Sequence, residues 1–334
     1  MRAFIVDRYG KDQPMRLGDL PEPQVGDNDV LIQVHAAALN LLDSKIKRGE
    51  FKQVLPQRIP FVLGHDVAGV VTRVGSRVRA FQVGDAVYSR VPDTRIGTLT
   101  EAVAVDQDAV APKPKNLSMV EAASIPLVGL TAWQALVEKA KLQRGQKVFI
   151  QAGSGGVGTF AIQLAKHLGA EVATTTSSAN IGLVKGLGAD VVVDYKVDDF
   201  ESKLRDCDLV LHSQDAKTLD KSLRVLKSGG QLVSISGPPD PQFAKDIEAP
   251  WFVQLAIRLL SLGARRKARR LGVTYSFLFM RADGSQLRQI AALVEAGAIR
   301  PVVDRVFPFE STNEAMAHVE SGRAKGKVVV SLVS

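Results

Sequence analysis

The chain has 334 residues and a net charge of +8, with hydrophobic and charged shares of 46% and 23%. This length suffices for two domains, and the composition excludes a disordered or fibrous chain. Cys207 is the only cysteine, which excludes structural disulfides within the chain and cysteine-rich zinc clusters, and favours a reducing compartment.

The N-terminal residues do not form a secretory signal. Residues 1–7 place an acid, Asp7, too early and leave the apolar run too short. No stretch of the sequence reaches the ~18 uncharged apolar residues that a membrane span needs. We therefore expect a soluble, cytoplasmic protein with no membrane span.

Residues 1–124 carry the pattern of a mostly β domain. Short β-branched runs at 30–38, 66–74 and 85–88 are separated by turns rich in glycine and aspartate. Near the end of this region, Ser118 and Glu121 form a capping-box pattern, which predicts the start of a helix.

The stretch 148–158 predicts a buried strand, a glycine turn and the start of a helix that continues over 159–168. Its Gly153, Gly155 and Gly158 fit G-x-G-x-x-G. In a dinucleotide site the first glycine permits the tight turn, the second admits the diphosphate, and the third lets helix and strand approach. The helix start offers free N–H groups to the anion. We therefore expect cofactor contacts along this turn, which consists of Gly153, Ser154, Gly155, Gly156, Val157 and Gly158.

From residue 125 to 280 strands and helices alternate. The predicted strands are 147–151, 171–175, 191–194, 208–211 and 231–235, with a further one at 273–279. This alternation predicts an α/β domain with a doubly wound parallel sheet. The tail, 281–334, contains a predicted helix and two strands that resemble the first domain, so we expect it to return there.

An apolar stretch, 251–262, is followed by the basic run 265–270. Three interpretations of the apolar stretch stay open: a core or dimer-interface helix first, a flap over a lipophilic acceptor second, and a membrane-surface anchor third. The basic run has no accompanying recognition motif, so we interpret it as a solvated helix end and expect no nucleic-acid partner.

Several motifs occur in the order found in one family. They are 40–49, similar to N-x-x-D-x-K-x-R-x-G, then Gly64-His65-Asp66-Val67-Ala68-Gly69, 129–133, the glycine turn, 187–190 and 323–328. With them the chain resembles the medium-chain dehydrogenase/reductase superfamily, and within it the zinc-independent quinone and enone oxidoreductases. The resemblance implies a GroES-like catalytic domain built from both chain ends, a Rossmann domain between them, an active site in the cleft, and a homodimer.

The resemblance also bears on metal binding. Related alcohol dehydrogenases hold a catalytic zinc through Cys, His and a further Cys or acid, whereas only His65, with Asp66 beside it, stands at such a position here. One imidazole does not make a site of three protein ligands. We therefore interpret His65 as a packing or hydrogen-bonding residue and expect no metal.

The end of the second Rossmann strand indicates the cofactor. An NAD site usually places an acid there, about twenty residues after the glycines, to bind the ribose 2′-hydroxyl. This chain has Thr176 and Ser177 instead, within a run of hydroxyl residues that can donate to a 2′-phosphate. We therefore expect NADPH. Lys185 and Tyr195 stand where related NADPH enzymes often add contacts, although a solvated lysine and a tyrosine that caps the core are the plainer alternatives.

The resemblance assigns further residues to the site. Asn40 is the leading polar residue near the nicotinamide and the acceptor carbonyl, with Asp43 as a loop-holding residue and Lys45 as a donor to a carbonyl. Many quinone reductases have tyrosine at the position of Lys45. Thr131, Ser236 and Lys327 are expected at the cofactor. After the fourth strand, where the family commonly has an aspartate-rich turn, this chain has His212. This residue is either a structural histidine or a ligand contact.

Together these features predict an NADPH-dependent, zinc-free reductase that transfers hydride to a quinone or an α,β-unsaturated carbonyl compound. Without a Lewis acid to ionise an alcohol, alcohol oxidation is disfavoured. Two alternatives stay open. The first is an enoyl-thioester reductase that uses the basic run, and the second is a nucleotide-binding protein with little turnover.

Overall fold

A computed structural model describes residues 1–52 and 55–333. The chain divides into two compact units: unit 1 comprises residues 1–130 and 281–334, and unit 2 comprises residues 131–280. The domain boundaries at 124 and 280 drawn from the sequence stay a prediction. Among the described residues, no helix combines the length and apolarity needed to cross a membrane.

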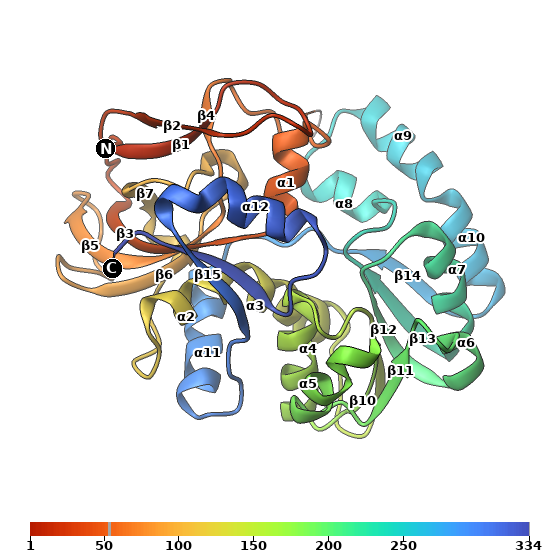
Figure 1. The fold of residues 1–334 in the computed structure, drawn as a ribbon. Coiled ribbons are helices and arrows are strands. Elements are labelled where there is room, and N and C mark those ends of the chain that lie inside the picture. The colour runs from red at the N-terminus through yellow and green to blue at the C-terminus, as the bar shows by residue number, and fades with distance from the viewer. Residues whose placement is uncertain (53–54, 334) are drawn as a thin grey trace. The chain divides into compact units, whose positions relative to one another are not determined.

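Unit 1 is the mostly β unit that the sequence predicts (Figure 1). Its strands are β1 (Arg2–Val6), β2 (Arg16–Asp19), β3 (Asp29–Leu39), β4 (Phe61–Val62), β5 (Asp66–Val74), β6 (Ala86–Arg90), β7 (Ala102–Asp106), β8 (Val110–Pro112), β15 (Val303–Pro308) and β16 (Lys327–Ser331). Its helices are α1 (Leu41–Arg48), α2 (Met119–Ala123), α11 (Gly284–Glu295) and α12 (Thr312–Glu320), and α3 (Pro126–Trp133) crosses into unit 2.

The larger sheet of unit 1 joins both ends of the chain. Its strand order is β15-β16-β3-β5-β6-β8, with β7 paired to β3. The last strand, β16, runs antiparallel to β3 and sets Val328 opposite Leu39. In the core beneath, the rings of Phe4 and Phe309 meet edge to face at 5.1 Å. The C-terminal residues therefore complete a sheet and a core that the N-terminal residues begin.

Unit 2 is built on one parallel sheet in the order β11-β10-β9-β12-β13-β14 (Figure 1). The strands are β9 (Lys147–Ile150), β10 (Glu171–Thr176), β11 (Val191–Asp194), β12 (Cys207–His212), β13 (Leu226–Ser234) and β14 (Thr274–Phe277). The helices are α4 (Gly156–His167), α5 (Ile181–Gly186), α6 (Phe200–Lys203), α7 (Ala216–Arg224), α8 (Pro241–Asp246), α9 (Trp251–Leu260) and α10 (Leu262–Arg270). This order confirms the predicted Rossmann sheet, whose strand order reverses between β9 and β12.

Local sequence signals account for several of these element limits. Ser118 caps α2, where its hydroxyl accepts a hydrogen bond from the Glu121 N–H, as the capping-box pattern predicts. The α4 helix begins at Gly156, three residues before the predicted start. Gly156 and Gly158 therefore belong to the first turn of the helix, Gly155 is its N-cap, and Gly153 precedes it.

Candidate active site

Close packing shapes the glycine turn between β9 and α4. A Cβ on Gly158 would lie 2.3 Å from the Ala152 carbonyl oxygen, and one on Gly153 would lie 2.2 Å from Thr174 Oγ1. A Cβ on Gly155 would instead meet, among the described atoms, only the Ala152 carbonyl oxygen, at 3.3 Å. Gly153 and Gly158 are therefore required by the fold, whereas Gly155 leaves open space beside the turn.

That open space lies at the start of a twelve-residue helix. Gly155 is the N-cap residue of α4 and offers no side chain to the first backbone N–H groups, which belong to Gly156, Val157 and Gly158. These groups and the helix dipole together attract an anion. The turn therefore fits the diphosphate of a dinucleotide.

Uncharged polar groups gather at the carboxyl end of β10, beside the glycine turn. Thr176 Oγ1 donates to Ser154 Oγ at 2.9 Å. Asn180 Nδ2 donates to Ser154 Oγ and to Ser177 Oγ, both at 3.3 Å. These side chains form a group of hydroxyls and an amide at the point where a dinucleotide's second ribose binds in this type of sheet.

The neighbouring strand adds an acid that the sequence reasoning missed. The register sets Asp194, at the end of β11, opposite Thr176, and the backbone N–H of Tyr195 donates to the Thr176 carbonyl at 3.2 Å. Asp194 accepts a hydrogen bond from the Ser178 hydroxyl, which holds the pKa of the carboxyl below its usual range. Its place at the end of a strand adjacent to β10 is the signal that could have revealed it.

The remaining residues predicted in unit 2 occupy varied positions. The Tyr195 side chain is exposed, and Lys185 is exposed on α5 with no ion pair to any described residue. Thr131 is buried in α3. Ser236 Oγ donates to the Gln214 carbonyl at 2.7 Å, which ties together the loops after β13 and β12.

His212 ends β12 and is fully buried. Burial lowers the pKa of its imidazole to about 4, against smaller raising effects of the Gln214 backbone and of Asp215. The side chain is therefore neutral at pH 7, which fits the structural alternative better than a role as a proton relay.

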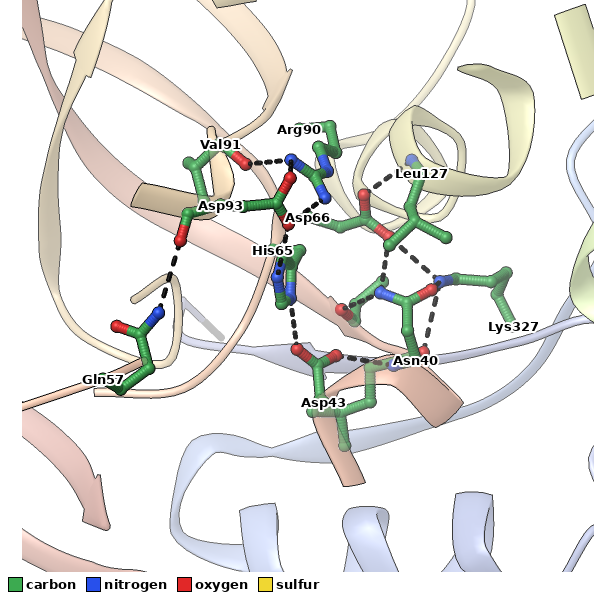
Figure 2. A network of polar contacts seen from close by, with 12 residues as sticks. Asn40, Asp43, Gln57, His65, Asp66, Arg90, Val91, Asp93, Leu127 and Lys327 are labelled. Carbon is green, nitrogen blue, oxygen red and sulfur yellow. Dashed lines mark hydrogen bonds and ion pairs between the residues drawn. The ribbon is translucent and has the colours of Figure 1, made fainter. Parts of the chain in front are cut away.

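In unit 1, the start of α1 organises a buried polar network (Figure 2). Asn40 is the N-cap residue, and its backbone N–H donates to Asp43 Oδ2 at 2.8 Å. The Asn40 amide donates to Asp66 Oδ2 at 3.0 Å and to the Ala38 carbonyl at 3.4 Å. Asn40 and Asp43 are therefore fixed by the helix start, and Asn40 is aimed at β5.

Lys327, the first residue of β16, supplies the cation of this group. Its ammonium donates to Asp66 Oδ2 at 3.0 Å, to the Leu39 carbonyl at 3.1 Å, and to Asn40 Oδ1. The backbone N–H of Leu127 completes the environment of Asp66 by donating to its other oxygen at 2.7 Å. All three ammonium hydrogens of Lys327 are thus engaged inside unit 1.

The second half of the network surrounds His65, which is fully buried (Figure 2). Its Nδ1 lies 2.6 Å from Asp43 Oδ1, and its Nε2 lies 3.7 Å from Asp93 Oδ1. Burial alone would lower the pKa of His65, but the charge and hydrogen bond of Asp43, with Asp93, raise it above its usual value. Arg90 neutralises Asp93 through contacts of 2.5 and 3.0 Å.

Each carboxylate of this network has a partner within the chain. Asp66 pairs with Lys327 and Asp93 with Arg90, and Asp43 lies against the imidazole of His65. Among the described residues, no group of three or more His, Cys, Asp or Glu side chains is arranged to hold a metal ion. The carboxylates around His65 therefore do not fit a zinc site, because Asp43 is engaged by the Asn40 N–H and the imidazole, Asp66 by Lys327, and Asp93 by Arg90.

Lys45 lies on α1, one helical turn beyond the residues that begin the network. Its side chain is exposed, and no described residue forms an ion pair with it. The next lysine along the helix, Lys47, is buried and lies 3.4 Å from Glu320. Of the two, only Lys45 has a free ammonium group.

Two family models match parts of the chain. Residues 26–115 match the model of the alcohol dehydrogenase GroES-like domain, and residues 187–330 match that of the zinc-binding dehydrogenases. The chain belongs to the medium-chain dehydrogenase/reductase superfamily, and within it to the zinc-independent quinone and enone oxidoreductases. These are dehydrogenases and reductases that use a nicotinamide cofactor.

Relatives are similar over nearly the whole chain. A mouse protein named mitochondrial NAD(P)H oxidoreductase RTN4IP1 is 37% identical, over 100% of this chain and 89% of its own length. An Arabidopsis thaliana protein named chloroplastic NADPH-dependent alkenal/one oxidoreductase is 34% identical, over 99% and 79%. The structure of a Coxiella burnetii quinone oxidoreductase superposes with a TM-score of 0.87 at 30% identity, over 99% of each chain.

The predicted cytoplasmic location is contradicted by these relatives. The mouse protein is named mitochondrial and the Arabidopsis protein chloroplastic, which points to an organelle. The prediction rested on the single cysteine and on the missing secretory signal. Neither feature distinguishes the cytoplasm from a reducing compartment inside an organelle.

Proposed function

We propose that this protein reduces quinones or α,β-unsaturated carbonyl compounds with NADPH and without a metal ion. The observation that carries this proposal is the pairing of the polar groups around His65, where Asp43 holds the imidazole, Arg90 pairs with Asp93 and Lys327 pairs with Asp66. A site without a Lewis acid suits acceptors that are already electron-poor. The names of the relatives, which include quinone and alkenal/one oxidoreductases, support the same acceptor class.

When bound, the reduced nicotinamide supplies the hydride. The backbone N–H groups at the start of α4 hold the diphosphate, and Gly155 leaves room for it. Ser177 and Ser154 donate to the phosphate on the second ribose, and Thr176 orients the Ser154 hydroxyl by donating to it.

On the acceptor side, the free ammonium of Lys45 donates to the carbonyl oxygen, where negative charge develops as hydride arrives. Asn40 is held in place by Asp66, the Ala38 carbonyl and Lys327, so its amide fixes the start of α1, and thereby the helix that carries Lys45. Lys327 therefore acts in this proposal as a positioning residue, although the sequence assigns it to the cofactor.

An acceptor panel tests the reaction. NADPH absorbance is followed with quinones, enones and an enoyl thioester, and NADP⁺ reduction is followed with alcohols. We expect turnover with quinones or enones. Turnover with alcohols alone would refute the proposal, turnover confined to the thioester would support the enoyl-thioester alternative, and no turnover with any acceptor would support a binding protein.

The preference for NADPH rests on the polar group at the end of β10, which contains no acid. Asp194 on the next strand opposes that preference, because its carboxylate is negative. We expect kcat/KM to be higher with NADPH than with NADH in the native protein, and Asp194→Asn to widen the ratio. Ser177→Ala should narrow it. A native preference for NADH would overturn this part of the proposal.

A further inference from the structure

Helices α9 and α10 form one almost uninterrupted helical segment, 251–270. Ser261 joins them in helical conformation, and the Arg265 N–H donates to the Ser261 carbonyl at 3.0 Å. The residues buried along it are Ile257, Ser261, Ala264 and Ala268. Their spacing of four, three and four residues places them on one face, which packs on the rest of unit 2.

The opposite face of α9 is apolar and exposed. Trp251 is 77% exposed, Phe252 58%, Leu255 49% and Leu259 62%. Positions i, i+1, i+4 and i+8 form a stripe on the side away from Ile257. The first interpretation of this stretch from the sequence is a core or dimer-interface helix, and its core part therefore does not hold for these four side chains.

The same face becomes basic along α10. The segment 251–270 contains six cationic residues, Arg258, Arg265, Arg266, Lys267, Arg269 and Arg270, and no acid. Lys267 lies 2.5 Å from Asp220, whereas the five arginines form no ion pair with any described residue. Unpaired arginines therefore follow an exposed stripe of aromatic and aliphatic side chains along one helical axis.

We propose that α9 and α10 dock this protein on the surface of an anionic lipid bilayer. Trp251, Phe252 and the two leucines enter the boundary between headgroups and acyl chains, and the arginines bind lipid phosphates. The segment lies on the membrane and does not cross it, in keeping with the absence of a membrane-crossing helix among the described residues. This inference is independent of the proposed reaction.

The charges favour a membrane over a second copy of the chain. A symmetric dimer contact through this face would set the unpaired arginines either against those of the second copy or against its apolar stripe, and neither arrangement supplies them with a counter-charge. An anionic surface instead satisfies the arginines and the apolar stripe at once. Nucleic acid would satisfy only the arginines.

Vesicle binding of the full-length protein tests the proposal. We expect co-sedimentation with vesicles that contain phosphatidylglycerol, little with pure phosphatidylcholine, and a loss of binding as salt concentration rises. Trp251 should report insertion through a blue shift of its fluorescence, which Trp251→Phe removes because Trp133 is the only other tryptophan. Weak binding that is the same for both lipid compositions would overturn the charge argument.

Variants with matched controls separate the two halves of the segment. Arg266→Glu, Arg269→Glu and Arg270→Glu combined should lower the partition coefficient at least about a hundredfold. The control carries the same charge change at three exposed cations elsewhere, Lys11→Glu, Lys217→Glu and Arg323→Glu, and should bind within about threefold of the native protein.

The apolar half has its own control. Phe252→Gln with Leu255→Gln should lower partitioning at least about tenfold. The same change at exposed apolar positions of unit 1 and unit 2, Val83→Gln with Val197→Gln, should leave it unchanged. Sedimentation velocity without lipid tests whether this face is instead a dimer interface. If the native protein is a dimer that does not bind vesicles, and Phe252→Gln with Leu255→Gln converts it to a monomer, the face is a dimer interface and the proposal fails.

Discussion

Replacing Lys327 with methionine removes the cation that stands between Asn40 and Asp66. Methionine keeps the length and apolar stem of the side chain but donates no hydrogen bond. The exposed fraction is 5% for the lysine side chain and 0% for that of Asp66, so water cannot replace the lost partner. The substitution therefore leaves a buried carboxylate without its counter-charge.

Breaking a buried ion pair by removing one partner costs about 3–5 kcal/mol. Asp66 keeps two hydrogen bonds, from the Leu127 N–H at 2.7 Å and from Asn40 Nδ2 at 3.0 Å, which favours the lower end of that range. We expect a loss of about 3 kcal/mol in the free energy of unfolding of unit 1. With a typical dependence on urea, the midpoint falls by about 1–2 M.

Two spectroscopic signals can assign the loss to unit 1. Both tryptophans, Trp133 and Trp251, lie in unit 2, so their fluorescence follows that unit, whereas circular dichroism follows both. In urea, the Lys327→Met variant should show an early dichroism change before the fluorescence transition. Arg73→Met serves as the control, because its pair with Glu22 is more than half exposed on both sides and should cost less than about 1 kcal/mol.

A double variant checks the electrostatic cause. Combining Lys327→Met with Asp66→Asn removes both charges, and the loss should be smaller than the sum of the two single losses by more than about 1 kcal/mol. If Lys327→Met costs no more than Arg73→Met, or if the two single losses simply add, the buried pair does not stabilise unit 1 as described.

Three further results are expected. The first concerns His65, whose pKa is raised in the folded protein. The stability that it contributes is therefore fully present below its unfolded pKa of about 6.5 and is lost as pH rises through the folded pKa. The difference in stability between the native protein and His65→Gln should narrow toward pH 9, and a difference that widens would contradict this. The pKa shift of His212 has the opposite direction, because burial lowers the pKa of its imidazole to about 4. The native protein should therefore lose stability relative to His212→Asn as pH falls from 6.5 toward 4. Thermal unfolding at several pH values measures this difference. Gly158→Ala should destabilise the fold by about 1–3 kcal/mol, because its Cβ would press on the backbone of Ala152. Gly155→Ala should keep native stability and raise the KM for NADPH at least about tenfold. Equal effects of the two variants on stability would refute the different roles given to the two glycines.

Much of the fold follows from periodicity and turn chemistry. The strand predicted at 66–74 coincides with β5, and the strand predicted at 147–151 is one residue longer than β9. The alternation of strands and helices correctly predicts the parallel sheet of unit 2. These features are local or repeat at short intervals, so the sequence displays them directly.

The polar network around His65 could not be predicted in the same way. Its pairs join residues that are far apart in the chain, such as Asp66 and Lys327, whose strands meet only because both pair with β3. The sequence indicated that Asn40, Asp43 and His65 matter, but the partners of their side chains depend on how β3, β5 and β16 align. The acid at Asp194 escaped notice for a similar reason, because only the sheet register sets it beside Thr176.

The apolar stretch that became α9 shows a second limit of sequence reasoning. Its residues are apolar nearly throughout, so hydrophobicity alone cannot tell which of them face the core. The structure decides this through packing, since Ile257 contacts the cluster around Phe243 while Trp251 and Phe252 are left exposed.

The pairing of β16 with β3 sets the order in which the protein is completed during synthesis. Unit 2 is continuous in sequence, so all its residues exist once Met280 has been made. Residues 1–130 must instead wait for the end of the chain, which takes about 10–40 s at usual rates of translation. Throughout that interval Asp66 lacks Lys327, and the part of β3 that pairs with β16, residues 36–39, has one edge unpaired and open to other strands. The part of the protein that is made first is therefore finished last, and the interval before chain release is when it is most exposed to misassembly and to chaperones.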